Sequence, residues 1–221
     1  KNALSYVGGP YAFHTIGSAF ALTARAYARQ GGMNRRKAGE DFYFINKLIK
    51  GEKFGEIINT TVKPSPRVSN RVPFGTGRAI LEAFQNKKDL TLTYNFKSFE
   101  VLKEWVDNIL KERYIYNDFP KLIKEYIRFQ DWNILHDMFL NNSQSKENYL
   151  KLFFTKFDAF WMLKFIHFSR DNHYSNKELI ICTNSLLVKS GYEPISSAVQ
   201  QLNFLRILDK KKGLKAPHKK V

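Results

Sequence analysis

Several features are scarce or absent in this chain of 221 residues, and each absence excludes a class of protein. Cys182 is the single cysteine, so no disulfide can form within the chain, which is typical of a reducing compartment. No apolar run approaches the roughly 18 residues that a membrane-spanning helix needs, and no charged start followed by an apolar run marks a signal peptide. We therefore expect a cytoplasmic protein.

Acidic residues are also few: 20 Asp and Glu face 36 Lys and Arg, for a net charge of +16. The excess lies at the two ends, with +8 in residues 1–75, +2 in 76–205 and +6 in 206–221. Basic ends favour an anionic partner such as lipid headgroups, nucleic acid or a phosphorylated substrate. The tail 206–221 is either a solvated end or a contact with the inner face of a membrane. Nucleic acid is disfavoured because no recognised binding motif is present.

The first third of the chain has the pattern of a small α/β unit. An apolar run at 13–22 predicts a buried strand, and the β-branched segment 55–62 predicts a second one. Short helices are expected at 23–30 and from the acidic pair to residue 50. The stretch 63–77 holds three prolines and two glycines, which indicates a loop.

The rest of the chain has helical periodicity. The segments 98–114 and 157–170 carry apolar residues at helical spacing. Ser175 and Glu178 are predicted to form a capping box for a further helix that Gly191 ends. We therefore expect an α+β fold that is mainly α-helical, with a small α/β piece at residues 1–77 followed by a helical extension with a basic tail at 78–221.

The acidic pair Glu40-Asp41 opens a predicted helix and can be interpreted in two ways. On a helix, Asp41 shares a face with Phe44, Ile45 and Leu48, so its carboxylate points toward the apolar side. A carboxylate there is costly unless it is hydrogen-bonded or faces a polar cavity. One interpretation is catalytic; the other is that the acids satisfy free N–H groups and the dipole at a helix N-terminus.

The order of these features resembles a known family. A strand with Gly17-Ser18, a short helix, Gly31-Gly32-Met33 and a helix opened by Gly39-Glu40-Asp41 is similar to the second half of the catalytic domain of family 2 glycosyltransferases. The string "PSPRVSNRVPFGTG" resembles a bacterial subgroup of that family. The resemblance covers residues 13–77 and implies part of a GT-A type, inverting fold.

The resemblance also implies roles for individual residues. Asp41 would be the general base that removes the proton of the acceptor hydroxyl, with Glu40 as a substrate contact. Arg67 and Arg71 can make bidentate contacts to the departing diphosphate, or they are ordinary surface arginines. His14 is either a contact to the acceptor or a histidine with a structural partner.

Two signatures of the family are missing. No Asp-x-Asp motif occurs in the 221 residues, so the half that binds the nucleotide sugar and a divalent cation, Mg²⁺ or Mn²⁺, is expected to lie outside this chain. The Gln-x-x-Arg-Trp signature of processive members is absent too. We therefore expect no cofactor or metal in this chain, and no activity from it alone.

The functional hypothesis is that the chain is the C-terminal part of an enzyme that moves a sugar from a nucleotide diphosphate donor to a hydroxyl acceptor. The alternative is a non-catalytic helical module that binds an anionic membrane or nucleic acid through its basic ends.

Overall fold

The computed structural model describes residues 1–17, 19–35, 39–50, 54–63, 65, 67–68, 75–85, 87 and 89–212. Helices dominate these residues, and their two short strands form one antiparallel sheet, so the fold is mainly helical α+β, as predicted. The elements are α1 (Asn2–Val7), α2 (Ala24–Arg29), α3 (Glu40–Lys50), α4 (Thr76–Phe84), β1 (Leu92–Thr93), α5 (Phe96–Leu110), the 3₁₀ helix η1 (Tyr116–Asp118), α6 (Lys121–Tyr126), α7 (Phe129–Asn141), α8 (Lys146–Lys156), α9 (Ala159–Asn172), β2 (Lys177–Glu178), α10 (Leu179–Lys189) and α11 (Ala198–Lys212).

The helix α5 runs through the centre of the core. Its residues Leu102, Trp105, Val106 and Ile109 are all fully buried, which confirms the apolar stripe predicted for 98–114. The Trp105 ring lies 5.0 Å from the ring of Phe157 in an edge-to-face geometry. Further aromatic rings surround it, from α7, α8, α9 and the residue that follows η1. Aromatic side chains therefore supply much of the apolar area that holds the helices together.

The N-terminal residues belong to this same core. Val7, Tyr11 and Phe13 are buried with the residues of α5 and α8, and Tyr11 donates its hydroxyl proton to the carbonyl oxygen of Phe154. Gly9 has a φ of +88°, and a Cβ there would meet the Phe154 ring at 2.8 Å, so a larger residue would not fit. The segment around α1 thus wraps the helical part, and the domain boundary at residue 77 stays a prediction.

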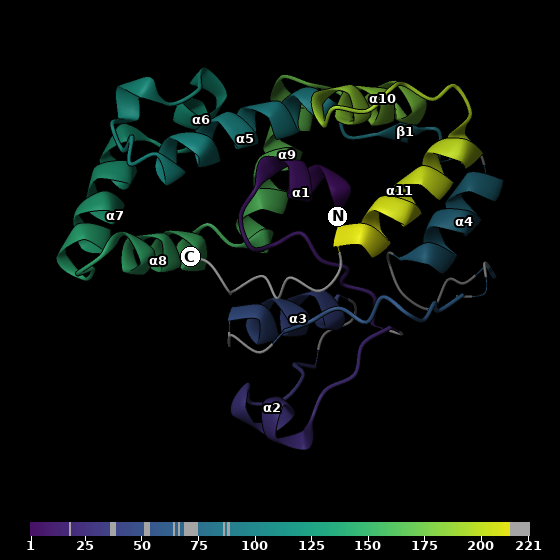
Figure 1. Ribbon diagram of the computed structural model, residues 1–221, viewed down its shortest axis with the longest axis horizontal. Helices are drawn as coiled ribbons and strands as arrows, with labels where there is room; N and C mark the ends of the chain where they lie inside the picture. The colour runs from purple at the N-terminus through teal and green to yellow at the C-terminus, as the bar shows by residue number, and fades with distance from the viewer. Residues whose placement is uncertain are drawn as a thin grey trace.

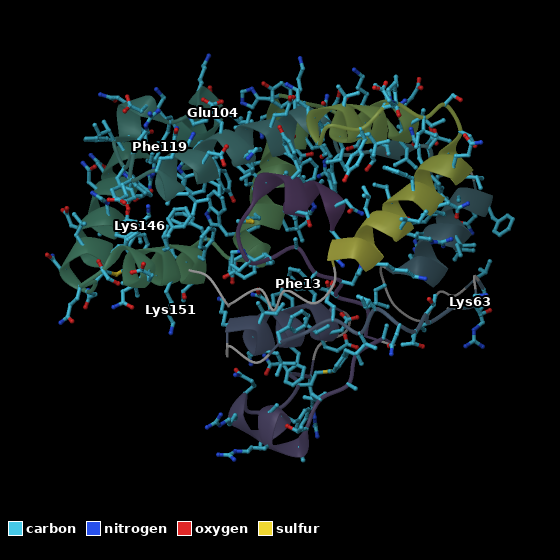
Figure 2. The ribbon with its side chains drawn as sticks, viewed as in Figure 1. Phe13, Lys63, Glu104, Phe119, Lys146 and Lys151 are labelled. Carbon is cyan, nitrogen blue, oxygen red and sulfur yellow. The ribbon has the colours of Figure 1, made fainter. Side chains whose placement is uncertain are left out.

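The labelled side chains of Figure 2 mark the two environments of the chain. Phe13 and Phe119 are buried in the core, whereas Glu104, Lys146 and Lys151 lie on the outer surface of α5 and α8.

Below this helical part, α3 lies between the core and α2, which forms the lower end of the molecule (Figure 1). The Tyr27 ring of α2 packs 5.4 Å from the Phe44 ring of α3.

The two strands predicted near the N-terminus are wrong. The described residues of 13–22 and all of 55–62 are irregular, and the sheet instead pairs Leu92 with Glu178 and Thr93 with Lys177. β-branched residues favour a strand when a neighbouring strand and a packed face are present. Here Ile57 is 72% exposed, so its segment has the composition of a strand without the burial that would stabilise one.

The helices predicted near residues 23–30 and 40–50 are confirmed as α2 and α3, and that at 157–170 as α9. The capping box is wrong: Glu178 is paired in β2 and no side chain caps the start of α10. The stop at Gly191 is confirmed, since its φ of +82° follows the last turn of α10.

Candidate functional site

The carboxylate of Asp41 joins two segments that the sequence singled out. Asp41 is the second residue of α3, and its Oδ2 accepts a hydrogen bond of 2.9 Å from the backbone N–H of Gly17. Its Oδ1 accepts the N–H of the next residue, Phe42, at 2.7 Å. The half-buried carboxylate is therefore oriented by one bond from its own helix and one from a distant segment.

Position 17 requires glycine because there is no room for a side chain beside Asp41, and not because of the backbone angle φ. Its φ lies outside the left-handed region, so any L-residue could adopt it, but a Cβ would lie 2.7 Å from Asp41 Oδ2 and 3.0 Å from Asp41 Cβ. Such contacts are well inside van der Waals distance. A side chain at position 17 would therefore displace the carboxylate.

The other predicted site residues lie apart from this pair or outside the described residues. Glu40 is half-buried in the first turn of α3, and Arg67 is exposed. His14 is 54% exposed, and its Nε2 lies 3.4 Å from Oδ2 of Asp209 in α11. Among described residues, no hydrogen bond or ion pair joins Asp41 to these three side chains. Arg71 lies outside the described residues.

The far end of α3 is held by a polar cluster that sequence reasoning missed. Asp158 caps α9 by accepting the N–H of Trp161 at 2.9 Å, and its other oxygen accepts bonds from Asn46 at 2.9 Å and Lys50 at 2.8 Å. Burial alone would raise the pKa of Asp158, but the bonds from Lys50, Trp161 and Asn46 outweigh it and leave the pKa below its usual value. The only local signal was the spacing of Asn46 and Lys50, which places them on one helix face.

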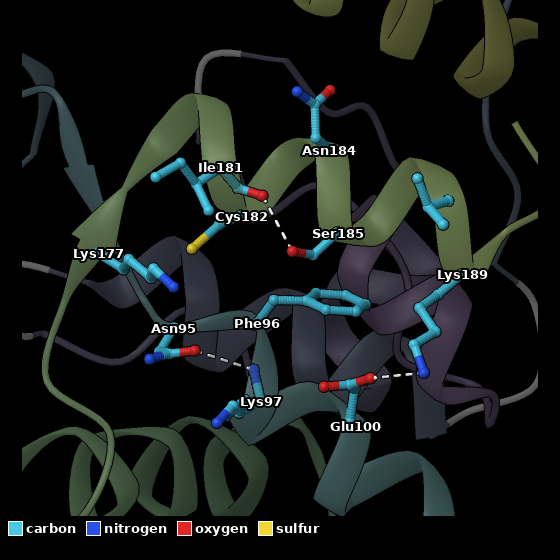
Figure 3. Close-up of a pocket in the computed structure, with 11 residues that line it drawn as sticks. Asn95, Phe96, Lys97, Glu100, Lys177, Ile181, Cys182, Asn184, Ser185 and Lys189 are labelled. Atoms are coloured by element: carbon cyan, nitrogen blue, oxygen red, sulfur yellow. Dashed lines mark hydrogen bonds and ion pairs between the residues drawn. The ribbon is translucent and has the colours of Figure 1, made fainter. Parts of the chain in front are cut away.

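A groove between the start of α5 and the outer face of α10 is the second candidate site (Figure 3). It has a volume of about 530 Å³, within the range of small-molecule pockets. Phe96 and Cys182 are buried beneath it, and three lysines and one glutamate line it. Sequence periodicity could not reveal it, because its two walls are more than 80 residues apart in the chain.

The described part of the chain has neither a cluster of metal-ligating side chains nor a helix suited to span a membrane. It holds no group of three or more His, Cys, Asp or Glu side chains that could bind a metal ion. None of its helices has the length and apolarity needed to cross a bilayer. Comparison with known protein families, with curated proteins and with solved structures gives no match.

Proposed function

We propose that this chain is the acceptor-side part of a family 2-like glycosyltransferase, with Asp41 as the general base. The enzyme would transfer a sugar from a nucleotide diphosphate to a hydroxyl group with inversion. The nucleotide-binding half and its divalent cation would be contributed by polypeptide other than these residues. The observation that carries the proposal is the orientation of the Asp41 carboxylate by the Gly17 N–H.

The geometry suits a base because the carboxylate is fixed and still has acceptor capacity. Each oxygen of Asp41 takes one N–H bond of the described structure. A carboxylate offers about four lone-pair positions, so about two remain for a substrate hydroxyl. The two backbone donors fix the carboxylate in one orientation, and a general base must be positioned within hydrogen-bond reach of the proton that it removes.

Arg67 supports the proposal because it is a candidate to bind the departing diphosphate. Its side chain is exposed, and no carboxylate among the described residues forms an ion pair with it. A guanidinium that is free in this sense can make bidentate bonds to a diphosphate as negative charge develops on it. His14 supports the proposal less, since Asp209 already faces its ring.

The test is the transfer rate of the complete protein that carries this chain, with Asp41→Asn and Glu40→Gln compared. Asparagine keeps one oxygen that can accept the Gly17 N–H, loses the second acceptor that takes the Phe42 N–H, and cannot act as a base; folding should survive at slightly lower stability. General-base removal should lower turnover by about 10²- to 10⁴-fold. Glu40→Gln is the matched control, because it removes the neighbouring charge and keeps Asp41, and it should be much milder.

Melting temperatures measured beside the rates separate the two interpretations of the acidic pair. If Asp41 serves the helix N-terminus alone, both variants should lose a little stability and keep transfer, and the catalytic assignment would then be wrong.

A further inference from the structure

The groove between α5 and α10 has an uneven charge distribution. Figure 3 shows Lys97 and Lys177 at one end, where the N-terminus of α5 meets β2, and the Glu100–Lys189 pair at the other. The Lys189 Nζ lies 3.1 Å from Glu100 Oε1, so those two charges compensate each other. Neither Lys97 nor Lys177 forms an ion pair with any described carboxylate. The first end therefore carries two ammonium groups that no described carboxylate neutralises, although the Lys97 Nζ also lies 5.8 Å from the centre of the Tyr174 ring in a cation–π contact.

Apolar side chains form the wall beside these lysines. Ile181 and Val188 are 41% and 55% exposed and lie seven residues apart, on one face of α10. The ring of Phe96 lies between the two walls. Exposed apolar residues scattered singly are ordinary, but here they line a concave surface that continues from a cationic end. The groove thus matches a molecule with one anionic end and one apolar end.

We propose that this groove binds a phosphate monoester with an apolar organic group, with the phosphate at Lys97 and Lys177 and the organic group along Ile181 and Val188. A phosphate monoester near neutral pH carries between about −1.5 and −2 charges and three acceptor oxygens, so it complements two ammonium groups better than a single carboxylate does. The proposal does not depend on the function assigned to Asp41.

Hexyl phosphate is a suitable probe, because its two parts can be offered separately. Inorganic phosphate supplies the charge alone and hexanol supplies the apolar chain alone. Calorimetry should show saturable binding of hexyl phosphate that is at least about fivefold tighter than that of either part, since burial of each CH₂ adds about 0.8 kcal/mol. Equal affinities for hexyl phosphate and inorganic phosphate would overturn the proposal.

Cys182 provides an independent readout, since it is the single thiol of the chain and is buried at the floor of the groove, so that a reagent reaches it through the groove. Bound hexyl phosphate should slow its alkylation by N-ethylmaleimide. Vesicles that contain phosphatidic acid, which is a phosphate monoester, form a second arm. Protection by both ligands assigns the groove to a lipid, and protection by hexyl phosphate alone assigns it to a soluble compound. Protection by neither would contradict the proposal.

A pair of variants tests the cationic end. Lys97→Gln with Lys177→Gln should weaken hexyl phosphate binding at least about fivefold, because each exposed charge contact adds a modest amount. Lys63→Gln with Lys164→Gln changes the net charge equally at two exposed lysines outside the groove, and should leave binding unchanged. Equal losses in the two double variants would show a general charge effect and refute the site.

Discussion

The contact between Gly17 and Asp41 predicts an unusual cost for a very small substitution. In Gly17→Ala the new methyl group would lie 2.7 Å from Asp41 Oδ2 and 3.2 Å from Asp41 Cγ. The carboxylate must rotate away, and the hydrogen bond from the Gly17 N–H is then lost. A hydrogen bond to a charged group contributes about 1.5 to 3 kcal/mol, and a partly exposed one less. We expect Gly17→Ala to lower the free energy of unfolding by about 1 to 2 kcal/mol.

Gly55 offers a matched control within the same irregular part of the chain. Its φ also lies outside the left-handed region, and a Cβ there would meet no atom within 4 Å. Replacing such a glycine with alanine restricts the unfolded chain and stabilises a protein by about 0.4 to 1 kcal/mol. Urea denaturation of both variants should therefore give shifts of opposite sign in the free energy of unfolding.

A double-mutant cycle attributes the cost to Asp41. In an Asp41→Ala background Oδ2 and Cγ are gone and only the Cβ at 3.0 Å remains, so Gly17→Ala should cost much less than it does beside the native carboxylate. The coupling free energy should then be about 1 to 2 kcal/mol or more, as expected for residues in contact. If Gly17→Ala costs no more than Gly55→Ala, or if the cycle is additive, the described contact does not orient Asp41.

Three further predictions concern charge. The pKa of Asp158 is lower in the folded than in the unfolded chain, so its stabilisation is present above about pH 4 and is lost as the pH falls through the folded value. In urea denaturation, Asp158→Asn should therefore reduce the fall in the free energy of unfolding at acidic pH. Burial lowers the pKa of His136 and His167 below the 6.5 of an unfolded histidine, so the unfolded chain binds more protons just below pH 6.5. The free energy of unfolding should therefore fall as the pH drops from 7.5 to about 5.5, and His136→Gln with His167→Gln should reduce that fall. If the basic tail binds anionic membranes, deleting residues 213–221, which carry three lysines, should weaken binding to anionic vesicles by about 1 kcal/mol per lysine at low salt. Vesicle flotation that changes neither with salt nor with the deletion would contradict the membrane contact.

Helices whose apolar or capping pattern lies within a short stretch of sequence were predicted well. The apolar stripe of α5 and the acidic start of α3 are visible in runs of about ten residues, because residues three and four apart share a helix face. Phe44 and Ile45, which share a helix face with Asp41, are buried, and Asp41 itself is half-buried. The orientation of the carboxylate by Gly17 could not be predicted from spacing.

Features that depend on distant partners were missed. The sheet has two residues per strand, which is too short for an alternating pattern, and its strands are some 85 residues apart. Residues 55–62 have strong strand propensity and yet remain irregular, because propensity acts through packing against neighbours that the described chain does not provide. The wall of the groove on α10 and the Asp158 cluster likewise arise from tertiary packing.

The two anchors of α3 give the helical part a role in the proposed chemistry. Gly17 binds Asp41 at the start of the helix, and Asp158 binds Asn46 and Lys50 in its second half. With a rise of 1.5 Å per residue, Asp41 lies about 13 Å along the axis from Lys50, so a tilt of roughly 5° about that end would move the carboxylate by about 1 Å. A displacement of that size can cost about 10²-fold in rate. Under the proposed function, α9 is therefore the support that fixes the position of the base, and Asp158→Ala should lower turnover although it lies far from the reacting atoms.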